Sequence, residues 1–355
     1  MNEMQLAVAG GRKTQSIVDH CCGANSNDRI LILTYTMANQ AEVRARLARH
    51  GPPSAQTDVM GWFSFLMAHW IRPYLPQRFP TRKLRGLNFE GDPDRHLTGE
   101  PRFLDSEGRA YKRHLAKLAV LVNLSSNGAV LDRLSRIYDR IWIDEVQDLN
   151  GHDLVVLEAL MDSPIELRLV GDVRQAILDT NVRDPKYKQY RGVKIKDWID
   201  LHERKGHLTI TYASITWRSN QEIANFADSI FPPERGFAPT ISENTRRTGH
   251  DGLYAIDLQH AAAYFKRFRP LCLRYNANSG KSVDLPFVNI GAAKGLDVER
   301  VALFPTGQMA AFIEKAKPLA DGAACSLYVA VTRARASVAF LAESPERLGF
   351  RTWRP

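Results

Sequence analysis

The chain has 355 residues, 44% hydrophobic and 25% charged, which fits a folded protein of two or three domains. The 48 lysines and arginines exceed the 39 aspartates and glutamates, and this basic balance favours an acidic partner such as nucleic acid. The sequence shows neither a signal peptide nor an apolar run of bilayer length, so we expect a cytoplasmic protein with no membrane partner.

Short apolar runs alternate with amphipathic segments along the chain. The pattern predicts strands at residues 5–9, 29–33, 140–143 and 167–170, and helices at residues 14–22, 38–50, 111–124 and 154–161. It returns later, with strands predicted at residues 271–275, 287–290 and 301–304 and a helix from Leu327 onward. Such alternation predicts α/β domains with parallel sheets covered on both faces.

Two segments interrupt this pattern. Residues 72–113 are rich in proline, glycine and arginine, and residues 181–198 hold six lysines and arginines among Tyr187, Tyr190 and Trp198. Cations between aromatic rings suit a single-stranded nucleic acid, because cations follow the phosphates and rings stack on the bases. The alternative is an ordinary solvated loop. The first segment opens a small basic and aromatic insertion near residues 72–135.

A glycine-containing loop joins the first predicted strand to the first predicted helix. Gly10, Gly11 and Arg12 precede Lys13 and Thr14. Backbone N–H groups of such a loop, at a helix N-terminus, can bind phosphates. Lys13 would then reach the β and γ phosphates, and Thr14 would ligate Mg²⁺. A strand–turn–helix without a ligand is the alternative, because Ala7 and Arg12 stand where this loop usually has glycine.

Two acidic residues follow the apolar strand 138–143. Asp144 suits Mg²⁺ binding, and Glu145 suits the general base that orients the hydrolytic water. Gln175 follows another predicted strand, at a Gly-Asp turn, and can hydrogen-bond a γ-phosphate or the attacking water. Arg218 and Arg333 are candidates for stabilising the charge of the transferred phosphoryl group.

Nine segments, in this order, resemble the superfamily-one DNA helicases of the UvrD/Rep/PcrA type. The resemblance covers most of the chain. The segments are AVAGGRKT (7–14), LILTYTMANQAEVRARL (31–47), VMGWFSF (59–65), IDEVQD (143–148), GDVRQAI (171–177), TWRSNQEIANFAD (216–228), LCLRYNANSG (271–280), NIGAAKGLDVERV (289–301) and LYVAVTRARA (327–336).

The resemblance implies a P-loop NTPase of two RecA-like domains, residues 1–205 and 206–355, with ATP and Mg²⁺ in the interdomain cleft. Lys13, Thr14, Asp144, Glu145 and Gln175 would belong to the first domain, and Arg218 and Arg333 to the second. Trp217 replaces a tyrosine that stacks on adenine, and Asp297 replaces a glutamate that contacts the nucleotide. The positions that would contact DNA are Thr34, Tyr35, Thr36, Trp62, Phe63 and Ser64.

The chain also departs from this family. Gln15, a candidate for contacting the nucleotide, replaces an arginine often found after the P-loop threonine, and the adenine-reading glutamine segment is missing. Arg12 replaces a glycine that lets the backbone approach phosphate. The accessory insertions are reduced: 77 residues separate the 59–65 segment from IDEVQD, and only a few lie between Gly280 and Phe287. We therefore expect little surface for engaging a duplex.

Three hypotheses of function follow. The leading one is a minimal DNA-stimulated ATPase that binds single-stranded DNA or DNA ends. The second is a hydrolysis-deficient scaffold or sensor, gated by nucleotide. The third is an ATPase subunit that works with a separate nuclease, as in phage-defence or repair systems, since no nuclease-like cluster of acids and lysine stands out in this sequence.

Overall fold

The chain folds into two compact units in the computed structural model, which describes residues 2–50, 55–181 and 183–355. Unit 1 comprises Met1–Gln5, Lys13–Gly171 and Asp179–Thr211, and unit 2 comprises Leu6–Arg12, Asp172–Leu178 and Tyr212–Pro355. The domain boundary at 205/206 stays a prediction. The two units differ from this predicted division because the short segments Leu6–Arg12 and Asp172–Leu178 belong to unit 2.

Unit 1 is built on a six-stranded sheet of order β3-β2-β6-β7-β1-β8. The pairs β2–β3, β2–β6 and β6–β7 are parallel, as the alternation of strands and helices predicts. The strands are β1 (Glu3–Ala7), β2 (Arg29–Thr34), β3 (Gln56–Gly61), β6 (Arg140–Ile143), β7 (Glu166–Gly171) and β8 (Thr209–Ala213). A separate parallel pair is formed by β4 (Gly86–Asn88) and β5 (Arg109–Tyr111).

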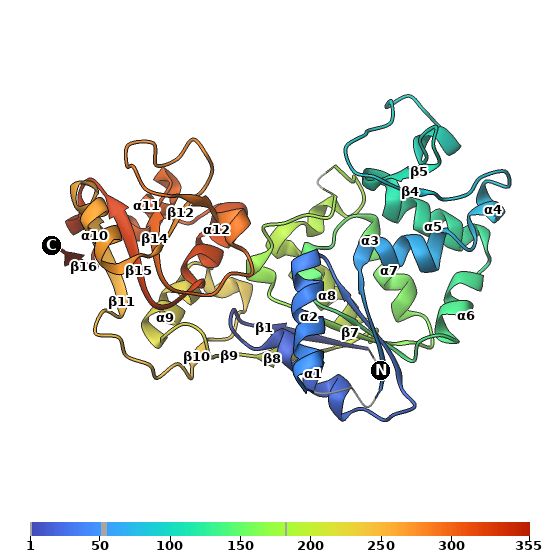
Figure 1. Ribbon diagram of the computed structural model, residues 1–355, viewed down its shortest axis with the longest axis horizontal. Helices are drawn as coiled ribbons and strands as arrows, with labels where there is room; N and C mark the ends of the chain where they lie inside the picture. Colours follow the sequence, from blue (N-terminus) through green and yellow to red (C-terminus); the bar gives the residue numbers. More distant parts are fainter. Residues whose placement is uncertain (1, 51–54, 182) are drawn as a thin grey trace. The chain divides into compact units, whose positions relative to one another are not determined.

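Helices cover this sheet because their apolar faces need a partner. The helices of unit 1 are α1 (Lys13–Gly23), α2 (Met37–His50), α3 (Trp62–Phe65), α4 (Leu75–Arg78), α5 (Leu115–Ser125), α6 (Ala129–Ser135), α7 (His152–Met161) and α8 (Ile195–Arg204). Helices α1 and α2 lie side by side (Figure 1). Their buried faces share a core with strands β2, β6 and β7, which includes Ile17, Val43, Ile32 and Trp142.

Unit 2 repeats this architecture with a second six-stranded sheet, of order β13-β12-β14-β15-β11-β16. Its strands are β11 (Gly252–Asp257), β12 (Leu271–Arg274), β13 (Val288–Asn289), β14 (Val298–Phe304), β15 (Ala334–Ala342) and β16 (Arg351–Trp353). Every pair in it is parallel. The prediction of an α/β fold with two parallel sheets is therefore confirmed.

Two helices of unit 2 begin at side-chain caps. The side-chain oxygen of Asn220 accepts a hydrogen bond from the backbone N–H of Ile223 at 3.1 Å at the start of α9, and Thr306 Oγ1 accepts from the N–H of Met309 at the start of α11. The helices are α9 (Gln221–Ser229), α10 (Ala261–Phe268), α11 (Gly307–Lys315) and α12 (Asp321–Val331), and the short strands β9 (Ile215–Thr216) and β10 (Ile241–Ser242) pair in parallel. No helix among the described residues has the length and apolarity needed to traverse a bilayer.

Candidate functional site

The glycine loop ahead of α1 is held by the backbone of unit 2. Gly10 has φ +74°, and a Cβ at this position would come within 2.6 Å of Thr216 Oγ1 and closer to Arg218 Cβ. Thr216 Oγ1 donates to the carbonyl oxygen of Ala9 at 2.7 Å, and the N–H of Trp217 donates to that of Gly10 at 3.2 Å. The close approach of two backbones explains why glycine is required at residue 10.

Arg12 has a backbone conformation that glycine adopts most readily. Its φ is +55°, in the left-handed region that side chains rarely adopt. Its guanidinium lies over the ring of Trp217, 4.3 Å from the ring centroid. That distance is within the range of an attractive cation–π contact, which offsets part of the backbone strain. The ring predicted to stack on adenine therefore carries an arginine on one face.

Lys13 and Thr14 open helix α1 in unit 1, where the first-turn N–H groups have no helical partner. Thr14 Oγ1 donates to Asp144 Oδ2 at 3.1 Å. Asp144 follows β6 and is buried, and this burial raises the pKa of its carboxyl to about 6. The negative charge of Glu145 adds to the rise, and the Lys13 ammonium opposes it. The structure thus brings together the residues that the sequence assigned to phosphate and Mg²⁺.

These residues fit a magnesium ion. Asp144 and Thr14 offer oxygen atoms only, which Mg²⁺ prefers, and the buried carboxylate lacks a full counter-charge from the protein. Within residues 2–50, 55–181 and 183–355, no group of three or more His, Cys, Asp or Glu side chains is arranged to hold a metal. A small ligand set suits Mg²⁺, which usually keeps several waters and binds substrate phosphates as well.

Glu145 has φ +58°, a strained backbone conformation of the kind that is concentrated at functional sites. Its carboxylate accepts a hydrogen bond from the side-chain amide of Gln147. Gly171, at the end of β7, leaves room for this amide, since a Cβ there would overlap Gln147 Oε1. Gln147, which holds the Glu145 carboxylate by this hydrogen bond, lies in the same acidic segment but was not among the candidate residues of the sequence.

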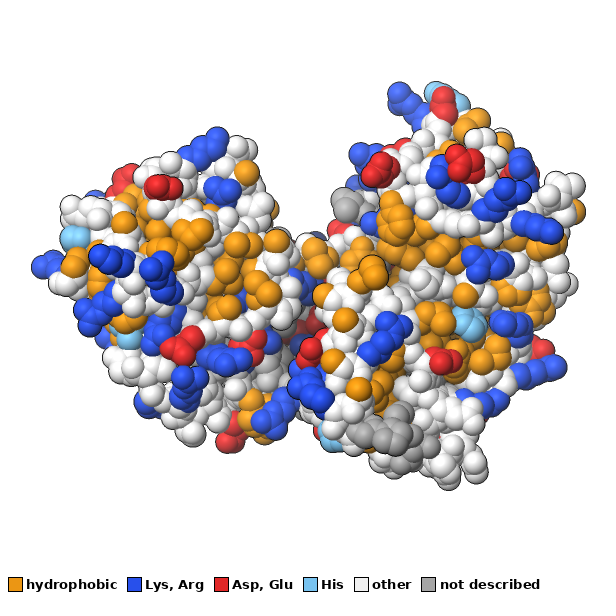
Figure 2. All heavy atoms as spheres, viewed as in Figure 1, with side chains coloured by type: hydrophobic (Ala, Val, Ile, Leu, Met, Phe, Trp, Pro, Cys, Tyr) orange, Lys and Arg blue, Asp and Glu red, His pale blue; other side chains and the backbone are white. Residues whose placement is uncertain are grey.

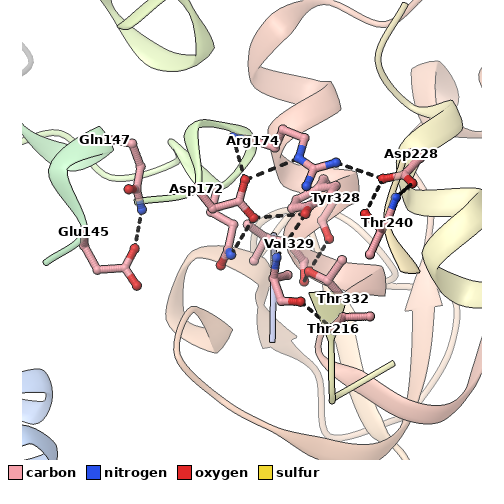
Figure 3. Close-up of polar contacts among 12 residues, drawn as sticks. Glu145, Gln147, Asp172, Arg174, Thr216, Asp228, Thr240, Tyr328, Val329 and Thr332 are labelled. Carbon is pink, nitrogen blue, oxygen red and sulfur yellow. Dashed lines mark hydrogen bonds and ion pairs between the residues drawn. The ribbon is translucent and has the colours of Figure 1, made fainter. Parts of the chain in front are cut away.

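A buried polar network lies in unit 2, around Asp172 (Figure 3). Asp172 Oδ2 accepts hydrogen bonds from the hydroxyl of Tyr328 at 2.9 Å and from Gln175 Nε2 at 3.0 Å. Asp172 Oδ1 accepts from Arg174 Nε at 3.3 Å, and Arg174 Nη1 pairs with Asp228 at 2.8 Å. The Tyr328 hydroxyl also accepts from the N–H of Ala9 at 3.3 Å. The glycine loop and the Gly-Asp turn are therefore linked through one tyrosine.

Arg333 is 1% exposed and is the centre of a second set of hydrogen bonds. Its Nη2 donates to Gln175 Oε1 at 2.8 Å, while Nε and Nη1 donate to the carbonyl oxygens of Val329 and Leu296 at 3.1 and 3.2 Å. Gln175, which the sequence analysis placed with the first domain, lies in the segment that packs with unit 2. Arg333 and Gln175 are thus in direct contact.

Arg218 and Asp297 form a more exposed group in unit 2. Arg218 Nη1 donates to the carbonyl oxygen of Thr332 at 3.1 Å, and Arg218 Nε lies 3.7 Å from Asp297 Oδ1. Asp297 also pairs with Arg335, at 2.8 Å from Nε. The carboxylate predicted to contact the nucleotide is therefore bound by two arginines in this structure.

Gln15 lies on α1 and faces α2. Its amide donates to Asp19 at 2.7 Å, and its oxygen accepts from Arg46 at 3.1 Å. It lines an open pocket of about 550 Å³, together with Glu42, Arg46, Arg49 and His50. Its predicted contact with the nucleotide stays a prediction.

Three of the predicted nucleic-acid contacts need correction. Trp62 and Trp198 are 1% and 0% exposed, so their rings are inside unit 1 and have no face on which a base can stack. Their indole N–H groups donate to Asp153 at 2.7 Å and to Glu158 at 3.1 Å, as is usual for buried tryptophans. Thr34 is 1% exposed and is equally inaccessible.

The other predicted contacts lie on accessible parts of unit 1. The rings of Tyr35 and Phe63 meet edge to face with centroids 5.7 Å apart, and Ser64 is exposed. Thr36 Oγ1 accepts a hydrogen bond from the N–H of Asn39 at 3.1 Å, near the start of α2. Tyr187 and Tyr190 are half-buried, with centroids 5.6 Å apart, and the Tyr187 hydroxyl donates to Glu158.

Known proteins resemble part of this chain. Residues 110–180 match the UvrD/REP helicase N-terminal domain. Two proteins from strains of Lactococcus lactis subsp. cremoris, the exonuclease/helicase protein RexA and an ATP-dependent helicase/nuclease component, are each 32% identical over 114 residues. This match covers 30% of the chain and only 8% of each relative.

A solved helicase shares the fold. Arterivirus nonstructural protein 10, a helicase, aligns with 98% of this chain and 61% of its own, with a TM-score of 0.50 and 13% sequence identity. At that identity the likeness concerns the fold alone. Over residues 110–180, which include the acidic Asp144–Glu145 pair, the chain is therefore similar to the UvrD/REP helicases.

Proposed function

We propose that the chain is a nucleic-acid-dependent ATPase of the UvrD-like helicase type. Lys13 binds the β and γ phosphates of ATP, and Thr14 and Asp144 hold Mg²⁺, which supplies charge neutralisation at the phosphates. Glu145 orients the attacking water and takes its proton. Arg218 and Arg333 stabilise the charge that develops on the γ-phosphoryl group. Gln175 accepts a hydrogen bond from Arg333 and so fixes the position of its guanidinium.

The contact between Thr14 and Asp144 carries this proposal. Thr14 begins α1 and Asp144 follows β6, 130 residues later, yet a hydroxyl and a buried carboxylate meet at 3.1 Å. The Lys13 ammonium is close enough to lower the pKa of the same carboxyl. This set of a lysine, a hydroxyl and a buried carboxylate suits a complex of Mg²⁺ with a triphosphate. The fold of unit 1 by itself does not require these three side chains to lie together.

A steady-state ATPase titration tests the proposal. Hydrolysis is measured with Mg²⁺ and single-stranded DNA, single-stranded RNA, blunt duplex or tailed duplex at several ionic strengths. We expect stimulation by single strands and by tailed duplexes above that by blunt duplex. Absence of hydrolysis under all of these conditions would overturn the proposal.

A hydrolysis-deficient, nucleotide-gated scaffold is the second candidate. The observation that favours it is Arg12, whose guanidinium covers one face of Trp217. On this hypothesis ATP binds without turnover and changes the affinity for nucleic acid. The test measures the binding of ATP and of a non-hydrolysable analogue, their effects on DNA affinity, and phosphate release. Equal effects of the two nucleotides with no phosphate release would favour the scaffold over the ATPase.

A partner nuclease is the third element of the proposal. The two Lactococcus relatives are named for helicase together with exonuclease or nuclease functions, and the present chain spans a small part of their length. We propose that this chain supplies ATP-driven movement on single-stranded DNA or DNA ends, and that cutting comes from another protein of a repair or phage-defence system. Co-purification from the native host tests this; recovery of the chain without any nuclease would contradict it.

A further inference from the structure

The net charge of the chain is concentrated in two separate segments. Residues 72–117 hold eleven lysines and arginines against six acidic residues, and residues 181–198 hold six against two. Their excess of positive charge equals the formal net charge of the whole chain, +9. The remaining residues are neutral on balance. Figure 2 shows lysine and arginine side chains gathered over the part of unit 1 that carries β4, β5 and α4.

The fold of unit 1 joins these two segments. The Asp92 carboxylate pairs with Arg183 at 2.7 Å and lies 3.5 Å from Arg113, so one acid of the first segment binds a cation from each. The side-chain amide of Asn181 donates to the carbonyl oxygen of Arg113. The ion pairs of Asp92 and the hydrogen bond from Asn181 join the two segments, which together we call the joined basic surface (residues 72–117 and 183–198).

Aromatic rings lie among these cations. Phe89 follows β4, and its side chain is 65% exposed. Its ring meets that of Phe63 edge to face at 6.4 Å, and Lys112 Nζ lies 5.4 Å from the Phe63 centroid. Lys186 Nζ lies 4.3 Å from the Tyr187 centroid. Phe89 therefore extends the pair of Tyr35 and Phe63 to a series of three rings with cations beside it.

We propose that the joined basic surface binds single-stranded nucleic acid, with Phe89 stacking on a base and Lys112 and Lys186 contacting phosphates. This inference rests on the proposed function, and it assigns a binding role to the β4–β5 insertion. Phe89 offers an exposed ring beside Phe63, which has Lys112 next to it, and every base has a face that can stack on such a ring. A single strand is favoured over a duplex because the bases of a duplex are already stacked.

Affinity for a fluorescent oligonucleotide of about 20 nucleotides tests the role of the ring. Fluorescence anisotropy without ATP is used, so the result does not depend on hydrolysis. We expect Phe89→Ala to weaken binding about 5- to 100-fold, the effect of losing one stacked base, and Phe89→Trp to retain it. Leu124→Ala is the matched control, because Leu124 is 66% exposed on α5 of the same unit. Melting curves of each variant show whether the fold is intact.

The salt dependence of binding tests the role of the cations. Each lost phosphate contact reduces the slope of log affinity against log salt by about 0.7 for a single strand. The double variant Lys112→Gln, Lys186→Gln should therefore lower the slope by about 1.4. Arg136 follows α6 and is an exposed cation paired with Asp132. The control variant Arg136→Gln should leave the salt slope unchanged.

Three results would overturn this inference. They are unchanged affinity of folded Phe89→Ala, an unchanged salt slope of the double variant, and tighter binding of blunt duplex than of single strands. A wild-type protein that binds single strands through Phe89 but hydrolyses no ATP would instead sink the proposed ATPase and leave the binding surface standing.

Discussion

Units 1 and 2 treat their proposed catalytic side chains in opposite ways. In unit 1, Asp144 is buried with a raised pKa, so its ionised form is incompletely compensated by the protein. In unit 2, the guanidinium of Arg333 is bound by two backbone carbonyls and by Gln175. Binding of a cation would stabilise the ionised form of Asp144, whereas the Arg333 guanidinium already has three hydrogen-bond acceptors in the protein. Asp144 therefore depends on a ligand for its counter-charge, and the position of Arg333 is fixed by the protein alone.

The largest effect is expected from removing the chemistry of unit 1. Lys13→Ala or Glu145→Gln should lower ATP turnover by about 10²–10⁴-fold, because each removes a charge or a base that acts on the γ-phosphoryl group. Affinity for single-stranded DNA should change by less than about twofold. Phosphate release and anisotropy measure the two quantities. Asp132→Asn on α6 serves as the control, and equal loss of turnover there would point to misfolding.

Arg333→Ala tests the preassembly of unit 2. Removing the guanidinium takes three hydrogen bonds from a side chain that is 1% exposed, those to Gln175 Oε1 and to the carbonyl oxygens of Val329 and Leu296. The free energy of unfolding should therefore fall by about 3–5 kcal/mol. Urea denaturation measures the loss. Arg335→Ala is the matched control, because Arg335 is about half exposed and its ion pair with Asp297 should contribute less than about 1 kcal/mol. Equal losses in both variants would remove the distinction between the units.

Asp144→Asn should stabilise the protein at neutral pH while abolishing Mg²⁺-dependent turnover. The folded pKa of about 6 is above the ordinary value of 3.8, so the native state holds a proton that the unfolded chain has lost. Stability without Mg²⁺ therefore falls as pH rises from about 4 to 6, by roughly 1–3 kcal/mol at most. Thermal denaturation in EDTA should show the variant above wild type at a pH of about 7.5 and equal to it near pH 4. A variant less stable than wild type at the higher pH would show that Asp144 is fully compensated.

Tyr328→Phe tests the link between the glycine loop and Asp172. The variant removes the hydroxyl that donates to Asp172 and accepts from Ala9, which should cost about 1–3 kcal/mol of stability and lower turnover about tenfold. Tyr138→Phe is the control: it removes a comparable hydroxyl that donates to Asp58 at 2.8 Å in unit 1. Both variants should lose stability, but only Tyr328→Phe should lose turnover. A loss of turnover in both would mean that stability alone explains it.

The smallest effect on stability is expected from Arg12→Gly. Glycine relieves the left-handed backbone, which costs about 1–2 kcal/mol, but it loses the contact with Trp217 and adds entropy to the unfolded chain. These effects nearly cancel, so stability should change by about 1 kcal/mol or less. Uncovering Trp217 should strengthen ATP binding severalfold, measured by quenching of tryptophan fluorescence. Unchanged or weaker binding would mean that Arg12 does not obstruct the ring.

The elements and the order of the candidate residues were readable from the sequence for a physical reason. A strand buried on both faces is largely apolar, so Ile141, Trp142 and Ile143 reveal β6, and the acids after it must lie at the carboxyl end of a sheet. Short strands such as β9 and β10 carry too few residues to show a period. A helix was predicted from Leu327 onward, but α12 begins earlier, at Asp321, and ends at Val331, before β15.

The burial of aromatic residues could not be read in the same way. Trp62 was expected to contact DNA because its segment resembles a helicase motif, and Trp198 because of its basic neighbours. Both rings are nevertheless buried in unit 1, where Asp153 and Glu158 accept hydrogen bonds from their indole N–H groups. Tyr328 was overlooked for the complementary reason. It lies five residues before Arg333 in an apolar run, where a tyrosine is indistinguishable from core until a buried acid is found beside its hydroxyl.

The path of the chain decides how this protein can be divided. Residues 6–12 and 172–178 pack with unit 2, although their immediate neighbours in sequence belong to unit 1. A gene fragment that begins near residue 212 would therefore encode the second sheet without the glycine loop, Asp172 or Gln175. In such a fragment, Tyr328 would lack its hydrogen bonds to Ala9 and Asp172, and Arg333 would lack its hydrogen bond to Gln175. We therefore expect the two halves to be unstable when they are produced separately.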